Sequence, residues 1–241
     1  MLPEGGLAET NPGGGAPSIS TTTGQMNVTL RAPRTVLSWT TFNVGPDASV
    51  NFKFDANNWI VLNRIIGLQP SKIEGVVTGK VGDNFGGNIW FVSNNSIIFG
   101  RQSQVDAGGF LAAIGTPDTS RFLDPGNNLF AFSGGDALPG SRLTVLSGGR
   151  ITGNGGLVAF AGPGVVTRFN ATVTANGASV LYGSARTFQI RLAPGAGGNF
   201  DLVDFIVPDI SGGSEEKVAL DLAADTRAGA VFVAAVSKSA I

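Results

Sequence analysis

Apolar and polar residues alternate along several short stretches of the chain, which is the pattern of half-buried β-strands. The alternation is clear over 26–30, 35–44 and 49–54, whereas 59–65 (WIVLNRI) is apolar enough for a strand buried on both faces. Gly, Pro and Asn separate these stretches at close intervals. The pattern therefore predicts an all-β chain of short strands joined by tight turns.

The first residues of the chain follow a different pattern. Residues 1–24 are rich in Gly, Pro and Thr and hold few apolar side chains. This composition predicts a loop with one short strand around Ser18–Thr22. We expect residues 1–35 to form a cap, because the end of a stack of strands exposes unpaired edges that must be covered.

A repeat is visible in the second half of the chain. The segments 150–162 (RITGNGGLVAFAG) and 172–184 (TVTANGASVLYGS) align, with an offset of 22 residues from Ile151 to Val173, and 226–240 repeats the later half of this unit. A period near 20 corresponds to one rung of a parallel β-helix. Stacked rungs align apolar side chains into interior columns, where each large buried side chain contributes about 1.5–3 kcal/mol.

Two stretches interrupt the rungs that we expect over 36–241. Residues 115–142 form a long connection with many Pro and Gly residues, and 186–210 contain two longer alternating stretches around a Pro-Gly turn. These features predict excursions from the β-helix, the second of them a β-hairpin on its surface. Residues 211–229 are the only plausible helix, although their VALDLAAD segment fits a strand and a turn equally well.

Three motifs in the middle of the chain resemble those of a known family. They are LNRIIG at 62–67, IWFVSNNSIIFG at 89–100 and VDAGGFLAA at 105–113. Their order resembles that in the N-terminal secretion domain of two-partner secretion exoproteins, the filamentous haemagglutinin-like family. That family has an Asn-Arg-Ile/Val-x-Gly block, an Asn-Pro-Asn-Gly turn, an apolar-Phe-Gly segment and a Val-x-x-Gly-Gly-Leu block. The resemblance implies an all-β, right-handed parallel β-helix with an N-terminal cap and extra-helical β-hairpin excursions.

The family also implies a function and a partner. The chain would be a single secretion domain, 1–241, and a fragment of a longer exoprotein or adhesin exported through the periplasm and outer membrane of a Gram-negative bacterium. A dedicated outer-membrane β-barrel transporter with periplasmic docking domains would recognise it, and the domain would then template β-helix folding outside the cell. We expect it to be secreted or held at the cell surface, and to be a monomer.

The motif positions supply the candidate site residues. The candidates for transporter recognition or for motif turns are Asn63, Arg64, Ser93, Asn94, Asn95, Ser96, Gly108 and Gly109. The turn keeps the family's third position as Asn95 but has lost its Pro and Gly. Asn tolerates left-handed backbone and bonds neighbouring amides, and Gly permits a positive φ. Each candidate could therefore equally be a solenoid corner that touches no partner.

The composition excludes several classes of function. The chain has no Cys and no His, which rules out thiol nucleophiles, disulfides, Cys/His zinc sites and histidine general bases. With a net charge of −1 and 14% charged residues, it offers no basic cluster for nucleic acid or an anionic membrane. We therefore expect no cofactor, no metal, no nucleic acid and no small-molecule substrate.

Two other functions are compatible with a β-helix, a carbohydrate-active enzyme and a direct adhesin module. The first needs carboxylates gathered on one face. The candidate charged residues of the central region are Asp83, Asp106, Asp118, Asp124, Arg101 and Arg121. No spacing places them together, and an Asp beside Gly, Pro or Asn is usually a turn former, so we expect no enzyme. The second needs exposed aromatic residues, whereas Trp39, Trp59 and Trp90 lie in apolar stretches typical of a core.

Overall fold

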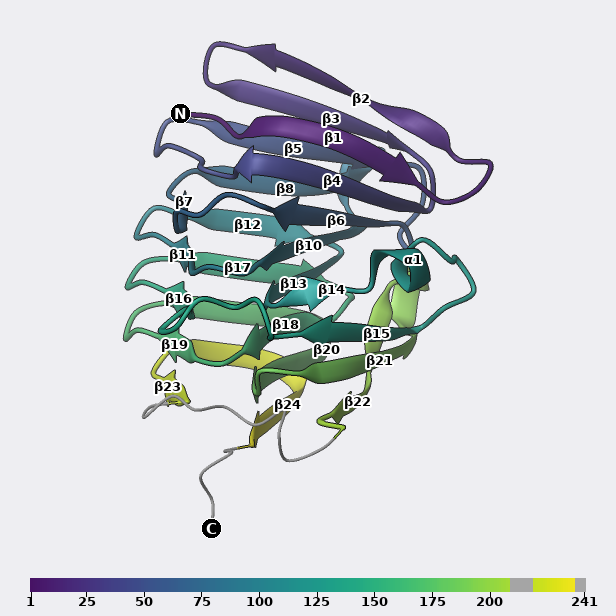
Figure 1. Ribbon diagram of the computed structural model, residues 1–241. Helices are drawn as coiled ribbons and strands as arrows, with labels where there is room; N and C mark the ends of the chain where they lie inside the picture. Colours follow the sequence, from purple (N-terminus) through teal and green to yellow (C-terminus); the bar gives the residue numbers. More distant parts are fainter. Residues whose placement is uncertain (209–218, 237–241) are drawn as a thin grey trace.

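The computed structural model describes residues 1–208 and 219–236 (Figure 1). Successive turns of the chain stack along one axis, and each full turn contributes one strand to each of three faces. The first face holds β3 (Gln25–Arg31), β5 (Ser49–Phe54), β8 (Val76–Val81), β12 (Gln104–Ala107), β17 (Arg150–Asn154) and the first part of β20 (Thr172–Ser184). The short β9 (Asn84–Phe85) pairs with β8.

The other two faces complete each rung. The second holds β4 (Arg34–Thr41), β6 (Ile60–Ile65), β10 (Asn88–Ser93), β13 (Gly109–Ile114), β18 (Val158–Gly162) and the rest of β20. The third, narrower face holds β7 (Ser71–Ile73), β11 (Ile97–Phe99), β16 (Leu143–Val145), β19 (Val165–Thr167) and β23 (Leu220–Leu222). The last strand, β24 (Asp225–Ala235), pairs with β20 along both of its parts.

The pairing confirms the predicted parallel β-helix and its repeat. Neighbouring strands on all three faces run parallel, and Ile151 lies beside Val173 in the register of β17 and β20. The 22-residue offset is therefore one rung. The segment 226–235 stacks on β20, as the repeat predicted.

The N-terminal residues form a cap, but it contains two strands instead of the expected loop with one strand, and it is shorter than the predicted 1–35. Residues 25–35 span β3 and the start of β4, which pair in parallel with the next rung. β1 (Glu4–Thr10) pairs antiparallel with β4, and β2 (Gly15–Thr22) pairs antiparallel with β3, so that two strands cover the edge of the first rung. β1 escaped the pattern because its side chains are mostly exposed and do not alternate in burial. Gly5 and Gly6, with φ of 105° and 91°, sit at irregularities in its pairing with β4.

The two excursions exist, and they join each other. The first carries β14 (Thr116–Pro117), the short helix α1 (Thr119–Phe122) and β15 (Leu129–Ser133), and the second is the hairpin of β21 (Phe188–Pro194) and β22 (Phe200–Ile206), with a 3-10 turn at Ala196–Gly198. Antiparallel pairing of β15 with β21 makes one four-stranded sheet in the order β14-β15-β21-β22. No local sequence pattern predicts this pairing, because β15 and β21 lie far apart in the sequence.

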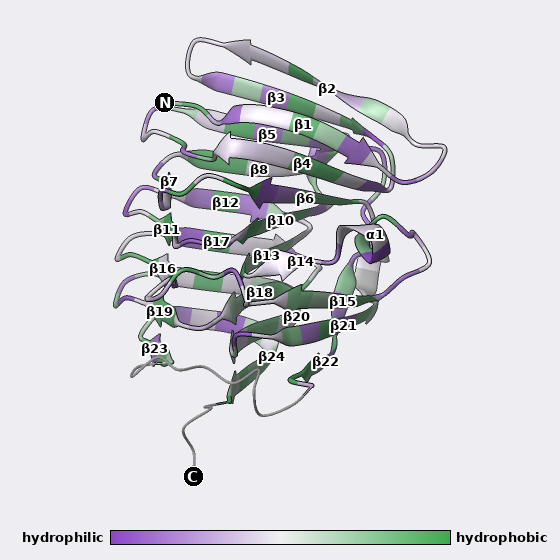
Figure 2. Ribbon diagram, viewed as in Figure 1, coloured by the Kyte–Doolittle hydropathy of each residue, from purple (hydrophilic) through white to green (hydrophobic). Residues whose placement is uncertain are grey.

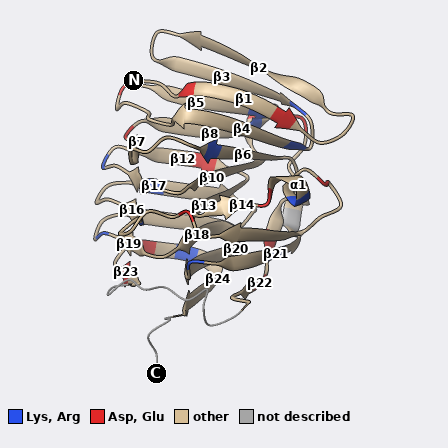
Figure 3. Ribbon diagram, viewed as in Figure 1, with Lys and Arg blue, Asp and Glu red and all other residues tan. Residues whose placement is uncertain are grey.

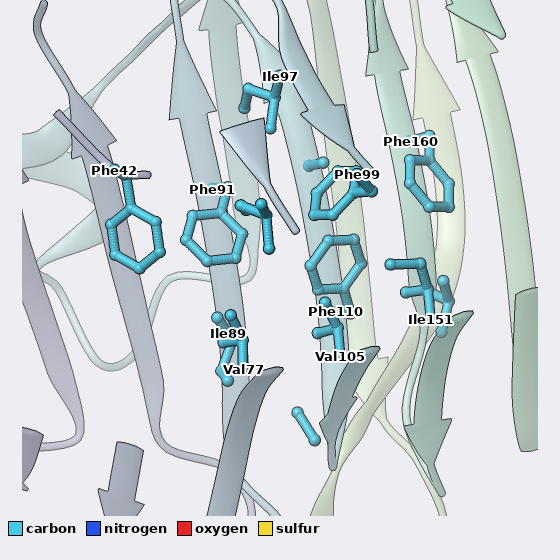
Figure 4. Close-up of a cluster of buried hydrophobic side chains, with 14 of the residues drawn as sticks. Phe42, Val77, Ile89, Phe91, Ile97, Phe99, Val105, Phe110, Ile151 and Phe160 are labelled. Atoms are coloured by element: carbon cyan, nitrogen blue, oxygen red, sulfur yellow. The ribbon is translucent and has the colours of Figure 1, made fainter. Parts of the chain in front are cut away.

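The interior of the solenoid is a continuous column of apolar side chains. Aromatic rings run through it from rung to rung (Figure 4). Phe42 meets Phe91 edge-on at a centroid distance of 4.7 Å, and Phe160 stacks on Tyr182 at 5.8 Å. Hydrophobic residues accordingly recur along the strands of the rungs (Figure 2). Such rings contribute about 0.5–1.5 kcal/mol per pair beyond the area they bury.

A second apolar cluster lies outside the solenoid, between its second face and the four-stranded sheet. Phe91 of β10 points into the interior cluster, whereas the adjacent Trp90 belongs to the outer one and meets Phe130 at 4.7 Å. Because of this double cover, the strands of the second face are buried at nearly every position. Trp39 and Trp90 are buried as predicted, and Trp59 is partly buried against the interior cluster.

The predicted helix over 211–229 is wrong where the structure describes it. Residues 220–222 form β23 and 225–229 belong to β24, in agreement with the alternative of a strand and a turn, while 211–218 lie outside the described residues. Pairing of β23 with β19 continues the third face, and this tertiary contact outweighs local helix propensity. The helix that does form, α1, was not predicted; it begins after Asp118, whose carboxylate accepts a bond from the Arg121 amide.

Candidate functional site

Four of the eight candidate residues line one hollow on the solenoid surface. Arg64, Ser93, Asn94 and Asn95 border a cavity of about 410 Å³. Its other walls come from the end of β6 and the segment after it, from β10, from the start of the first excursion and from the loop after β15; these are residues 65–68, Val92, 115–117, Asp136 and Leu138. The first two motifs, which are separate in the sequence, therefore meet at one corner, which we call the motif hollow.

The predicted turn between β10 and β11 is present, and side-chain bonds hold it. Ser93 Oγ accepts from the Asn95 amide at 3.0 Å, and Asn95 Oδ1 accepts from the Ser96 amide at 2.7 Å. The expectation of left-handed backbone is wrong, because Asn170 is the one residue other than Gly with positive φ in the described ranges. The hydroxyl and amide groups stabilise the turn without that geometry.

The turn also fixes the two loops that border the hollow. Asn95 Nδ2 donates to the Leu68 carbonyl at 2.7 Å, and the Asn94 carbonyl accepts from the Leu138 amide at 2.8 Å. Asn94 Nδ2 bonds Thr116 Oγ1, which in turn donates to Asp136 at 3.0 Å. The walls of the motif hollow are thus held in place by the motif residues themselves.

The rim of the motif hollow is apolar and open to solvent. Ile66, Leu68 and Leu138 are 59%, 79% and 41% exposed. Motif reasoning missed these three residues. A large apolar residue in a Gly-rich or Pro-rich loop, as in IGLQP and DALPG, is the signal that could have found them, since single exposed residues become a patch only when the fold gathers them.

Asn63 and Arg64 are neighbours in sequence with opposite environments. Asn63 is fully buried; it accepts from the Trp39 indole N–H at 2.9 Å and donates to the Trp90 carbonyl at 3.1 Å. Arg64 points outward, where it bonds Ser38 Oγ and forms a 3.1 Å ion pair with Glu9 of the cap strand β1. Asn63 therefore joins neighbouring rungs by hydrogen bonds within the interior. Arg64 links the cap to the first two rungs beside the motif hollow.

The remaining candidates lie away from the motif hollow. Ser96 Oγ accepts from the Arg142 amide, which joins two rungs. Gly108 and Gly109 do not have the expected positive φ. Neighbouring atoms lie too close to these two positions to leave room for a side chain. A Cβ on Gly108 would lie 2.7 Å from the Gly87 carbonyl oxygen, and one on Gly109 would collide with the Asn88 side-chain amide.

Residues 5–227 match the family model of the TPS secretion domain. The chain belongs to that family. The resemblance drawn from the three motifs is therefore confirmed, and the chain is a secretion domain of the kind found in two-partner secretion exoproteins.

Relatives of this secretion domain are long proteins. The chain is 26% identical over 113 residues to the heme/hemopexin-binding protein of Haemophilus influenzae (strain Rd), which covers 47% of this chain and 12% of that protein. A second heme/hemopexin-binding protein of Haemophilus influenzae is 24% identical over 108 residues, covering 45% and 11%. The match therefore spans about a tenth of the length of these curated relatives.

A solved structure supports the same fold. The chain resembles the crystal structure of the HMW1 secretion domain from Haemophilus influenzae with a TM-score of 0.64 and 17% identity, over 86% of this chain and 49% of that one. At that identity the likeness shows the fold alone. It agrees with the parallel β-helix described above.

Three of the candidate charged residues of the central region make local structural contacts. Asp118 caps α1, Asp124 accepts from the Gly126 amide in a turn, and Asp106 accepts from Gln104 on its own strand. Charged residues are thinly scattered along the ribbon (Figure 3). In residues 1–208 and 219–236, no three acidic side chains gather as a metal site would require. No helix within those ranges is long and apolar enough to cross a membrane.

Proposed function

We propose that this chain is the secretion domain of a longer exported exoprotein and that an outer-membrane β-barrel transporter with periplasmic docking domains recognises it. The observation that carries the proposal is the family match over residues 5–227. The route would lead through the periplasm and outer membrane to the cell surface or the medium. The domain acts in this proposal as a recognition signal and has no catalytic role.

The motif hollow is the proposed recognition surface. It brings Arg64, Asn94 and Asn95 to one place and surrounds them with exposed apolar side chains. A hollow with a few fixed polar groups and an apolar rim suits an extended peptide segment, whose side chains fill pockets while its backbone forms hydrogen bonds. The proposed occupant is such a segment of the transporter's periplasmic domains.

The last rung supports the proposed role as a folding template. Val231 and Val233 of β24 lie beside Val180 and Tyr182, which belong to the interior column. Val231 and Val233 are nevertheless 48% and 59% exposed. A further rung would cover them and pair with the side of β24 that has no strand partner within residues 1–208 and 219–236, so each added rung would find an ordered edge to pair with.

A pull-down tests the recognition surface. Purified chain is mixed with the periplasmic docking domains of the transporter, and Leu68→Asp and Leu138→Asp are compared with the native chain. Because both side chains are exposed, the fold should survive, whereas burial of a carboxylate in an apolar interface should weaken binding at least about tenfold. Phe169→Asp, which changes an exposed apolar residue outside the hollow, is the matched control.

Two outcomes would contradict the proposal. Undiminished binding of Leu68→Asp and Leu138→Asp would exclude the motif hollow as the contact surface. Normal surface export of a full-length exoprotein from which residues 1–113 have been deleted would refute the secretion role itself. The pull-down tests whether the motif hollow is the contact surface, and the deletion tests whether the domain is needed for secretion at all.

A further inference from the structure

The four-stranded sheet depends on two distant parts of the chain. Its elements β14, α1, β15, β21 and β22 span 116–133 and 188–206, and we call them the clasp. Phe130 of the first part lies beside Ile190 of the second. The first part alone offers only the two-residue strand β14 to pair with β15, and so small a strand pair is marginal in water.

The clasp covers a surface that the rungs create. Trp90, Leu111 and Leu181 come from β10, β13 and β20, and each is at most 3% exposed beneath it. The clasp supplies the facing side chains, among them Phe132, which stacks on Phe188 at 5.0 Å. Until the clasp is complete, these outward side chains of the second face have no such cover.

One cation connects the clasp to the first rung. The guanidinium of Arg34, on β4, lies 5.3–5.7 Å from the ring centroids of Phe122, Phe130 and Phe200, which belong to α1, β15 and β22. Its Nη2 donates to the Asn127 carbonyl at 3.3 Å. Nη1 has no hydrogen-bond partner among the described residues, so its neighbours are the aromatic faces.

Arg34 keeps its charge in this setting. Burial lowers the pKa of Arg34 to about 10, and nearby Asp124 partly opposes the shift. At neutral pH the side chain is therefore protonated, and the attraction between the cation and the rings is present. Two of the three rings come from the first part of the clasp and one from the second.

We propose that the clasp closes as a single unit after the rungs have stacked, and that Arg34 ties both of its halves to the first rung. Pairing of 129–132 with 188–191 closes a longer loop than pairing of adjacent rungs. The clasp also needs the finished second face to pack on. If the chain crosses the outer membrane with its N-terminus first, the outer apolar surface of the second face thus stays uncovered until residues 188–206 have also crossed. Burial of that surface would then stabilise the folded rungs outside the membrane and oppose their movement back through it.

Pulse-labelled hydrogen exchange during refolding of the full chain tests the order. Peptides covering 116–133 and 188–206 should gain protection together, and later than peptides from β6, β10 and β13. Protection of the clasp before the rungs would overturn the proposal. So would protection of its two halves at different times. This test uses the native chain and does not depend on the proposed transporter.

The role of Arg34 is tested by native-state exchange of Arg34→Ala. Both halves of the clasp should exchange roughly tenfold faster, which is about 1.4 kcal/mol, within the range of cation–π attraction for a desolvated site. Peptides from β12 and β17, on another face, should be unchanged. Arg31→Ala, at an exposed position on β3, is the matched control. Faster exchange confined to β4, or to one half of the clasp, would contradict the proposal that Arg34 connects both halves of the clasp to the first rung.

Discussion

Asn63 illustrates how one motif residue can serve the interior of the fold. Its amide satisfies two groups that β6 brings together, the indole N–H of Trp39 and the carbonyl of Trp90. An unsatisfied buried polar group costs about 1–3 kcal/mol. The structure therefore explains the Asn of the family block without any partner, whereas the adjacent Arg64 remains available at the surface.

We predict that Asn63→Leu lowers the free energy of unfolding by about 2–5 kcal/mol, because two buried groups lose their partner. Urea unfolding followed by circular dichroism measures the change. Asn51→Ala is the control; Asn51 bonds Asn27 on the outer side of the first face, and its loss should cost less than about 1 kcal/mol. Equal free energies of unfolding for the native chain and Asn63→Leu would show that these hydrogen bonds contribute nothing to stability.

The glycines of the third motif lead to a second prediction. Gly108→Ala should destabilise the chain by about 1–3 kcal/mol, since the new methyl group would press on the backbone of Gly87, which cannot move aside like a side chain. Gly135→Ala serves as the comparison, because its nearest neighbour is Ser133 Oγ at 3.6 Å and its φ is ordinary. Thermal unfolding distinguishes the two; a harmless Gly108→Ala would contradict close approach as the cause.

At the scale of elements, the short helix α1 depends on one carboxylate. Bonds from the Ser120 hydroxyl and the Arg121 amide to Asp118 lower the pKa of Asp118 below 3.8. A lowered pKa means that the cap is fully formed above 3.8 and is lost as the pH falls through the folded-state value. Acid should therefore loosen α1 before it affects the rungs.

The measurement is the exchange rate of the Arg121 amide between neutral pH and well below pH 3.8. We predict that its protection falls on acidification in the native chain. Asp118→Asn keeps an oxygen acceptor at the cap but does not titrate, so its protection should show no such fall. If both proteins responded alike to acid, the carboxylate would not be the cause.

Elements also show what sequence patterns can and cannot reveal. Alternation predicted β3, β4 and β5, and a dense apolar run predicted β6. The offset between Ile151 and Val173 predicted the register of neighbouring rungs, because each of these signals is local or periodic in the sequence. The pairing of β15 with β21 follows no period and could not be read in advance. The same holds for the motif hollow, whose apolar rim comes from loops that only the coil of the chain brings together.

At the scale of the whole molecule, the two ends of the solenoid differ. The N-terminal end carries antiparallel strands, with β2 outermost, and such a reversal interrupts the parallel stack. At the other end β24 continues the parallel register, and interior positions such as Val231 and Val233 lack cover in the described part of the chain. This polarity suits growth in one direction, as the proposed template requires.

The polarity leads to the last prediction. Val231→Thr with Val233→Thr keeps the β-branched shape and should change the stability of this chain by less than about 1 kcal/mol, because both side chains are half exposed. In the proposed longer exoprotein the same hydroxyls would be buried by the next rung without partners, at about 1–3 kcal/mol each. Refolding of the longer protein, followed by protease resistance beyond residue 241, should then be slower and less complete. Val203→Thr on β22, half exposed but outside the stack, should leave that refolding unchanged. Normal refolding of the double variant would mean that the following rungs do not use β24 as their template.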